Sequence, residues 1–162
     1  MSRSPMVFTI ADLHIGNKSI ITRNAPFRIF NTIDEHNRAI VENWNSHVLK
    51  RDTVWCLGDL LFDPKNFPII GELKGNKKLI LGNHDLYNLA LYQEYFTEIA
   101  SIKEIHGGIL THIPIHPSQF KRYKFNVHGH LHDEVLDDDR YINVCVERIG
   151  MKPVSLREII KN

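Results

Sequence analysis

The sequence predicts a four-layer α/β/β/α sandwich in which two mixed sheets are flanked by helices. Strand and helix patterns alternate in the first half of the 162 residues, whereas the second half contains mostly short strand patterns. Several strand patterns end directly in clusters of Asp, His and Asn. We expect a single domain over residues 1–162, because the length suits one domain and no linker, repeat or low-complexity segment divides the chain.

Three strands are expected in the first half. An apolar run predicts the first of them at Met6–Ile10, which would be buried. Similar runs predict the other two strands at Thr53–Leu57 and Lys77–Leu81. Each run ends in a polar cluster, and loops after strands commonly carry functional residues. We therefore expect a site where these three strands end.

The helices of the first half follow from apolar spacing. Apolar residues recur at helical intervals over Asp34–Lys50, and Thr32 or Asp34 is suited to cap that helix. Two shorter helices are expected at Asn66–Leu73 and Leu86–Phe96. The segment Ser19–Asn31 has no clear period and contains Pro26, so we predict a loop there.

The second half contains short strand patterns separated by turns. The four strands are expected at Ser101–Ile105, Gly108–Thr111, Lys124–His128 and Tyr141–Val146. A short amphipathic helix is expected over Val154–Lys161, with Ser155 as its cap. This mixture of strands completes the second sheet of the predicted sandwich.

Overall composition excludes some function classes. The 20 Lys and Arg residues balance 19 Asp and Glu residues, so no net field draws the protein onto nucleic acid or an anionic membrane. No apolar run is long enough to cross a bilayer, which favours a cytoplasmic protein without a membrane partner. Cys56 and Cys145 lie in apolar runs without a CxxC pattern and are expected to be buried thiols.

The polar clusters contain the side chains that bind divalent metal ions. Carboxylate, imidazole and amide oxygen together suit such ions. If the segments are extended, residues two apart point the same way, so Asp12 and His14 can face one ion, as can His130 and His132. The alternative is that these are polar loop residues and ordinary core histidines. Five clusters in order, each after a strand pattern, favour a metal site.

These clusters resemble the signature of the calcineurin-like metallophosphoesterases, which runs D-x-H, G-D, G-N-H-D/E, H and G-H-x-H. In this chain the five blocks are Asp12-Leu13-His14, Gly58-Asp59, Gly82-Asn83-His84-Asp85, His112 and Gly129-His130-Leu131-His132. The resemblance spans most of the chain, and no block is missing. It implies a hydrolase that uses two divalent ions, with manganese favoured and iron, zinc, nickel or cobalt also compatible with the ligands.

The resemblance also implies a role for each residue. The first ion would be held by Asp12, His14 and His132. The second ion would be held by Asn83, His112 and His130. Asp59 would bridge both ions, His84 would be the catalytic histidine, and Asp85 would support His84. The implied reaction is in-line attack of a metal-bridging hydroxide on a phosphate ester.

The role of His84 is open in one respect. As an imidazolium it could hydrogen-bond a phosphate oxygen or protonate the departing alkoxide. It could instead stabilise the transition state electrostatically. His128 is a third alternating histidine, but the register of the final motif favours His130 and His132 as ligands, so His128 is expected to be a supporting or core residue. His116 is expected to be a loop histidine, with a position at the rim near substrate as the alternative.

The substrate is less well defined. Arg23 and Arg28 follow the first motif, and Arg122 lies in a second basic stretch, so these three could grip phosphate oxygens, or they could belong to solvated loops. Aromatic residues beside Arg122 make a nuclease or a nucleic-acid end-processing phosphatase the alternative. We place a small, nucleotide-like phosphate monoester or diester first and a catalytically inactive metal-binding scaffold last. The oligomeric state stays open.

Overall fold

The computed structural model describes residues 3–23 and 27–161 and contains two mixed sheets. The first sheet has the strand order β4-β3-β2-β1-β9, in which β1 to β4 are parallel and β9 is antiparallel to β1. Its strands are β1 (Val7–Ile10), β2 (Thr53–Cys56), β3 (Asn76–Ile80), β4 (Glu98–Ala100) and β9 (Val154–Ser155). Because β1, β2 and β3 are parallel, the polar clusters that follow them meet at one edge of the sheet.

The second sheet has the strand order β5-β6-β7-β8. Its strands are β5 (Lys103–Ile105), β6 (Gly108–Leu110), β7 (Asn126–His128) and β8 (Tyr141–Asn143). The β5–β6 pair is antiparallel, whereas β6, β7 and β8 are parallel. A bridge between Ala11 and Cys145 joins the segments that follow β1 and β8, so the two sheets meet next to the first polar cluster.

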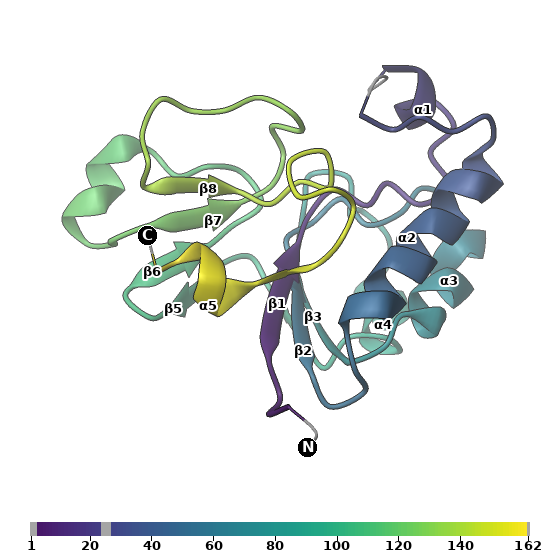
Figure 1. The fold of residues 1–162 in the computed structure, drawn as a ribbon, viewed down its shortest axis with the longest axis horizontal. Helices are drawn as coiled ribbons and strands as arrows, with labels where there is room; N and C mark the ends of the chain where they lie inside the picture. The colour runs from purple at the N-terminus through teal and green to yellow at the C-terminus, as the bar shows by residue number, and fades with distance from the viewer. Residues whose placement is uncertain (1–2, 24–26, 162) are drawn as a thin grey trace.

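Three helices lie together beside the first sheet (Figure 1). They are α2 (Ile33–His47), α3 (Phe67–Glu72) and α4 (Leu89–Gln93). Thr32 caps α2 by accepting a hydrogen bond from the Glu35 amide, as the sequence predicts. Ile40 and Trp44 form part of the buried face of α2, and the Trp44 indole donates to the Lys74 carbonyl at 2.8 Å.

The remaining helices are short. They are α1 (Ile20–Arg23), η1 (Pro64–Asn66), η2 (Pro117–Lys121) and α5 (Leu156–Ile159). The predicted α/β sandwich of two mixed sheets flanked by helices is confirmed, with a heavier helical layer beside the first sheet. Within the described ranges, none of the helices has the length and hydrophobicity needed to span a membrane.

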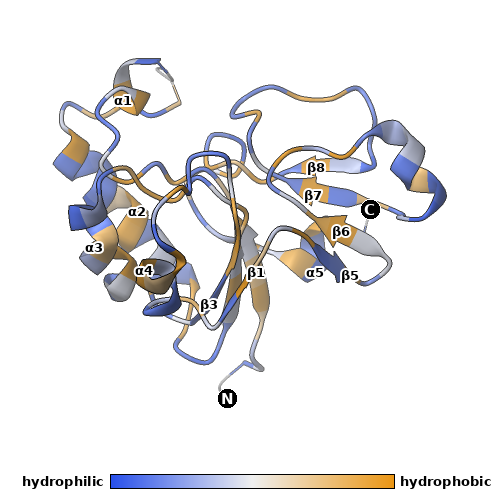
Figure 2. Cartoon of the chain, turned by 180° about the vertical axis from the view of Figure 1, so that it is seen from behind, coloured by the Kyte–Doolittle hydropathy of each residue, from blue (hydrophilic) through white to orange (hydrophobic). Residues whose placement is uncertain are grey.

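Two apolar cores hold the layers together. The larger includes Phe8, Ile40, Trp44 and Leu79 and lies among the first sheet and its helices. The smaller includes Leu110 and Val127 of the second sheet and residues such as Trp55, Ile80 and Leu156. Figure 2 shows apolar residues along β6 and helices that carry both polar and apolar residues. Cys56 and Cys145 are free thiols buried in these regions, as predicted.

Some element boundaries differ from the prediction. The expected helix over Leu86–Phe96 is limited to α4, because Asn88 adopts a non-helical backbone and caps the helix by accepting from the Ala90 amide. The segment Val154–Lys161 starts with β9 and only then becomes helical. Strand β4 was not predicted, and the strand expected at Ser101–Ile105 begins at Lys103.

The expected loop Ser19–Asn31 contains the single helical turn α1. Pro26, on which that prediction partly rested, lies outside the described residues.

Candidate metal centre

The loops after β1 and β2 run side by side and bring the first two motifs together. The amides of Asp12, His14 and Ile15 donate to the carbonyls of Gly58, Asp59 and Leu60 at 2.9–3.0 Å. Gly82 lies against this pair of loops: a Cβ atom there would overlap the Asp59 carboxylate. A glycine is therefore required for the third motif to approach the second.

Five of the seven predicted metal ligands have a left-handed backbone. The φ angles are 59° at Asp12, 51° at His14, 54° at Asp59, 70° at His130 and 52° at His132. Non-glycine residues seldom adopt this region, and such conformations cluster at functional sites. The sequence argument assumed extended segments, so it was wrong about why these side chains converge. Their convergence comes from tight, locally strained loops.

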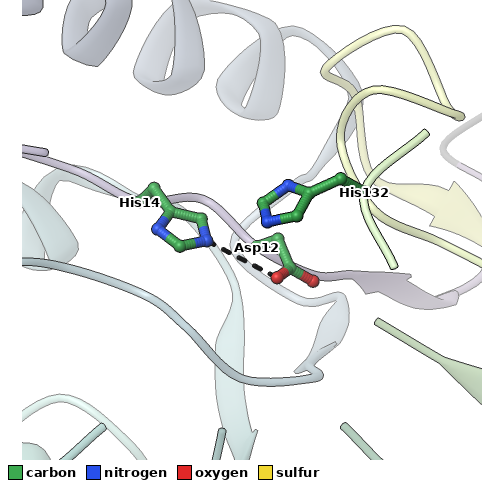
Figure 3. A group of neighbouring side chains, drawn as sticks. All are labelled: Asp12, His14 and His132. Atoms are coloured by element: carbon green, nitrogen blue, oxygen red, sulfur yellow. Dashed lines mark ion pairs between the residues drawn. The ribbon is translucent and has the colours of Figure 1, made fainter. Parts of the chain in front are cut away.

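The first group of candidate ligands contains Asp12, His14 and His132 (Figure 3). One potential ligand atom from each side chain lies within 4.8 Å of the others. The His14 Nε2 atom is 3.5 Å from the Asp12 Oδ1 atom. Both atoms are buried and have no hydrogen-bond partner among the described residues. A cation is the natural partner for buried acceptor atoms of this kind.

The surroundings of Asp12 and His14 keep these two side chains in their metal-binding forms. Burial opposes ionisation of Asp12, but its close contact with His14 and the attraction of the nearby histidines outweigh burial and lower the pKa of Asp12 to about 2. Burial also lowers the pKa of His14, although the Asp12 carboxylate acts in the opposite direction. An ionised carboxylate and a neutral imidazole are the forms that bind metal ions.

In a second group, ligand atoms of Asp12, Asp59 and His112 lie within 4.8 Å of one another. Asn83 and His130 adjoin it. The Asn83 Oδ1 atom lies 2.9 Å from His112 Nε2 and 3.0 Å from His130 Nδ1. The His112 Nδ1 atom is 2.7 Å from the Leu57 carbonyl, so it must carry a proton. In the neutral ring, Nε2 then presents a lone pair to the oxygens of Asn83 and Asp59. Several acceptor atoms thus converge, which again suits a cation.

Asp59 lies between the two groups. Its Oδ1 atom is 3.5 Å from His112 Nε2, and its Oδ2 atom is 3.8 Å from His14 Nε2. The Asp59 side chain is almost fully buried. One carboxylate oxygen therefore faces each group.

His84 lies at the accessible side of the cluster. Its side chain is 48% exposed, and its Nε2 atom is 3.9 Å from Asp59 Oδ2. The backbone amide of His84 donates to Asp59 Oδ1 at 2.9 Å. Phe62 packs against both histidine rings, with centroid distances of 5.2 Å to His84 and 5.3 Å to His14. His84 can therefore contact a bound substrate while its main chain is fixed to Asp59.

Asp85 joins the backbones of two motifs, and the support of His84 that the family resemblance implies stays a prediction. Its carboxylate accepts hydrogen bonds from the amides of Asp59, Leu60 and Gly82 at 2.8–3.0 Å. It is buried, and burial raises its pKa although these amides act in the opposite direction. Asp85 thus holds the backbone of the Gly58-Asp59 motif to that of the Gly82–Asp85 motif. Its side-chain hydrogen bonds, within the residues that the structure describes, go to these backbones and not to the His84 ring.

Arg28 is a correction to the predicted substrate contacts. Its side chain is fully buried, so it does not present its guanidinium to a substrate. The guanidinium donates to Glu147 Oε1 at 2.7 Å and to the backbone carbonyls of Leu13 and Asp12. Its Nη1 atom is 3.0 Å from His36 Nε2, and burial together with Arg28 lowers the pKa of His36 to about 4. Arg28 therefore supports the loop that carries Asp12 and His14.

Glu147 is the residue that the sequence analysis missed. Its Oε1 atom lies 2.9 Å from His132 Nδ1, and its side chain is buried beside Arg28. The hydrogen bond to Glu147 raises the pKa of His132 and directs the ring so that Nε2 can face Asp12 and His14. The sequence offers one weak signal, an acidic residue directly after the apolar run Val144–Val146.

The other predicted residues lie apart from this cluster or at its margin. Arg23 is exposed at the end of α1. Arg122 is exposed and forms an ion pair with Glu104 at 2.7 Å. His128 is buried with its Nδ1 atom 2.8 Å from the Gly129 carbonyl, and His116 caps η2. The positions of His128 and His116 agree with the predicted supporting and loop roles.

Residues 6–153 match the family described as calcineurin-like phosphoesterase. The chain belongs to this family. An uncharacterized protein of Methanocaldococcus jannaschii is 32% identical, with 96% of this chain and 89% of the relative aligned. The gene 66 protein of Mycobacterium phage D29 is 29% identical over 80% of each chain.

One solved structure has the same fold over nearly all of the residues in this chain. It is a protein of unknown function from Aquifex aeolicus, with a TM-score of 0.79 and 28% sequence identity, and the match covers 98% of this chain and 99% of that protein. These relatives support the family and the fold. The donor set and the unpartnered buried atoms of Asp12 and His14 fit the divalent metal ions that the family binds.

Proposed function

We propose that this protein is a phosphoesterase that uses two divalent metal ions to hydrolyse a small, nucleotide-like phosphate monoester or diester. Family membership supports phosphoester hydrolysis, and the side-chain groups support metal binding. The observation that carries the two-ion proposal is the position of Asp59, which has one carboxylate oxygen toward His14 and the other toward His112. A single carboxylate in that position can serve two ions at once.

The ligands divide as the family resemblance implies. Asp12, His14 and His132 would hold one ion, Asn83, His112 and His130 the other, and Asp59 both. Such ions, when bound, neutralise phosphate charge and lower the pKa of water, which makes a nucleophile available near neutral pH. Manganese is our first choice, because mixed nitrogen and oxygen ligands without thiolate suit it.

His84 would act on the leaving group. Hydrolysis forms a bond from the water oxygen to phosphorus and breaks the bond from phosphorus to the ester oxygen, which must then gain a proton. The half-exposed ring of His84, held by Phe62 and by its backbone bond to Asp59, can donate that proton or hydrogen-bond a phosphate oxygen.

The small-ester proposal is favoured over a nuclease by the placement of the basic residues. Arg122 forms an ion pair with Glu104, and its neighbour Tyr123 donates to the same carboxylate at 2.7 Å. A nucleic-acid strand would need free cations along its path. The presence of His84 and all seven ligand positions favours an enzyme over an inactive scaffold.

The test is turnover of p-nitrophenyl phosphate and bis-p-nitrophenyl phosphate with manganese, with and without chelator. We expect chelator-sensitive release of p-nitrophenol that is lost in the Asp59→Asn variant. Manganese titration by calorimetry should give two ions per wild-type chain. An Asp63→Asn variant, changed at an exposed carboxylate, should behave as wild type. Turnover that survives both chelation and Asp59→Asn would refute the proposal.

A further inference from the structure

A pocket adjoins the second group of candidate ligands. It has a volume of about 460 Å³, and Asn83 and His112 form part of its wall. The rest of the lining is mostly aliphatic or backbone and comes from Leu81, Gly82, Ser101, Ile102, Thr111, Ile113, Pro114 and Ile115. The pocket thus continues directly from the place where a phosphate group would sit in the proposed function.

Two of its isoleucines are unusually exposed. Ile102, in the turn between β4 and β5, is 52% exposed, and Ile113, after β6, is 53% exposed. Leaving large apolar side chains in water forgoes the free energy of their burial. Exposed apolar residues gathered next to a polar site are typical of a ligand-binding surface.

The segment that carries Ile113 is held firmly. The buried Asn126 side chain accepts from the Ile115 amide at 3.0 Å and donates to the Thr111 hydroxyl at 2.9 Å. That hydroxyl donates to the Ile113 carbonyl at 2.7 Å, and the Tyr141 hydroxyl donates to the Ile115 carbonyl at 2.6 Å. These hydrogen bonds fix the loop backbone and hold Ile113 in its exposed position. The side chain is therefore preorganised for a ligand.

The lining also determines what kind of group fits. None of the residues that line it in the described part of the chain is Lys, Arg, Asp or Glu. A second phosphate or a polyanionic strand would find no counter-charge there. An uncharged, largely apolar group would be able to displace water from Ile102 and Ile113 and bury their exposed surface.

We propose that this pocket binds the apolar organic group of the phosphate ester, so that the enzyme prefers esters that carry an aromatic ring there over esters with a small alkyl group. The proposal rests on the proposed function, because it places the phosphate beside Asn83 and His112. It identifies Ile102 and Ile113 as specificity-determining residues outside the metal site.

The test compares two diesters with the same leaving group, p-nitrophenyl phenyl phosphate and p-nitrophenyl methyl phosphate. In the manganese-loaded wild type we expect kcat/KM to favour the phenyl ester by about tenfold, the factor that burial of a small apolar area provides. The Ile102→Ser/Ile113→Ser double variant should reduce this ratio toward one by lowering kcat/KM for the phenyl ester. The control is Leu49→Ser, a similar change at a 41% exposed residue that precedes β2, at the opposite end of the strand.

A binding experiment tests the pocket independently of whether the protein hydrolyses phosphate esters. Phenylphosphonate and methylphosphonate, which carry no ester bond, are titrated into the manganese-loaded protein and followed by isothermal titration calorimetry. Tighter binding of phenylphosphonate that is lost in the double variant supports the pocket even if no ester is hydrolysed, in which case only the proposed function fails. Equal affinity of the wild type for both phosphonates, or a phenyl preference that survives the double variant, would overturn the pocket proposal.

Discussion

The pair of Arg28 and Glu147 shows how single buried residues position the candidate metal centre. Neither side chain is exposed, and their atoms are 2.7 Å apart. Arg28 holds the backbone of the Asp12 loop, and Glu147 holds the His132 ring. Two candidate ligands that lie far apart in the sequence, Asp12 and His132, are thus positioned by one buried ion pair. Breaking such a pair leaves a buried charge without its partner, which is strongly destabilising.

The first residue-scale prediction concerns Glu147→Gln. Because this change removes the carboxylate that orients His132, we expect affinity for manganese at one of the two sites to fall by about 10- to 100-fold. The other site, formed around Asn83 and His112, should change little. Isothermal titration calorimetry on the metal-free protein measures both affinities.

The matched control is Glu98→Gln. Glu98 also forms ion pairs, with Lys78 and Lys103, but these lie at the partly exposed sheet edge far from the candidate ligands in the fold. Its removal should leave both manganese affinities unchanged. Equal losses at the two sites in Glu147→Gln would show that Glu147 acts on the fold as a whole and would contradict a specific role in orienting His132.

The candidate ligands could be predicted from the sequence, whereas Arg28 and Glu147 could not. The ligands occur in short motifs whose residues are neighbours in the chain, and each motif follows a strand. The contact between Arg28 and Glu147 spans 119 positions and depends on the way the two sheets meet at Ala11 and Cys145. An arginine in a polar segment gives no signal that it will be buried, so it was interpreted as a substrate contact.

At the scale of elements, the loops after β2 and β3 form one unit. Asp85 accepts three backbone hydrogen bonds, two from the loop after β2 and one from Gly82. In return, Asp59 accepts the His84 amide. These reciprocal bonds fix the candidate bridging residue relative to the candidate catalytic histidine, without a contact to either ring.

We predict that Asp85→Asn weakens this unit. An amide side chain has one acceptor oxygen, so at least one of the three buried amides loses its partner. This should lower the free energy of unfolding by about 1–3 kcal/mol, as measured by urea denaturation without metal. Manganese affinity should fall as well, because Asp59 would be held less firmly.

The comparison variant is Asp63→Asn, in which an exposed carboxylate caps η1 and pairs with Lys65. It should unfold like the wild type. An Asp85→Asn protein with wild-type stability and metal affinity but reduced turnover would instead favour the role that the family resemblance implies, direct support of His84.

The predicted elements were most accurate where packing and local pattern agree. Helix α2 has a capping Thr32 and a regular apolar face, so its bounds differ little from the prediction. Strand β4 (Glu98–Ala100) was not predicted because it is too short to show a sequence pattern. It is defined by its pairing with β3, about 20 residues earlier in the chain. The same holds for β9, a two-residue strand that exists only through β1.

At the scale of the whole molecule, the candidate metal centre and a buried stabilising cluster lie at opposite ends of the first sheet. The candidate metal centre lies where β1, β2 and β3 end. Asp52 lies where β2 begins, is fully buried, and accepts the amides of Met6 and Leu49 at 2.9 and 2.7 Å. Arg3 donates to the same carboxylate at 2.7 Å. This cluster ties the entry of β1 to the turn between α2 and β2.

The final prediction is that Asp52 makes stability depend on pH without affecting the metal centre. The Arg3 hydrogen bond and the two amides outweigh burial and lower the pKa of Asp52 to about 2. Since the folded-state pKa lies below the ordinary value of about 4, the carboxylate stabilises the fold above pH ~4, and this contribution is lost as pH falls toward 2. Urea denaturation at several pH values measures the free energy of unfolding of the wild type and of Asp52→Asn. The difference between the two proteins should therefore be largest near neutral pH and should shrink below pH ~4. Manganese affinity at neutral pH should be the same in both proteins. A stability difference that stays constant down to pH ~2 would mean that Asp52 contributes through its shape and hydrogen bonds, not through its charge.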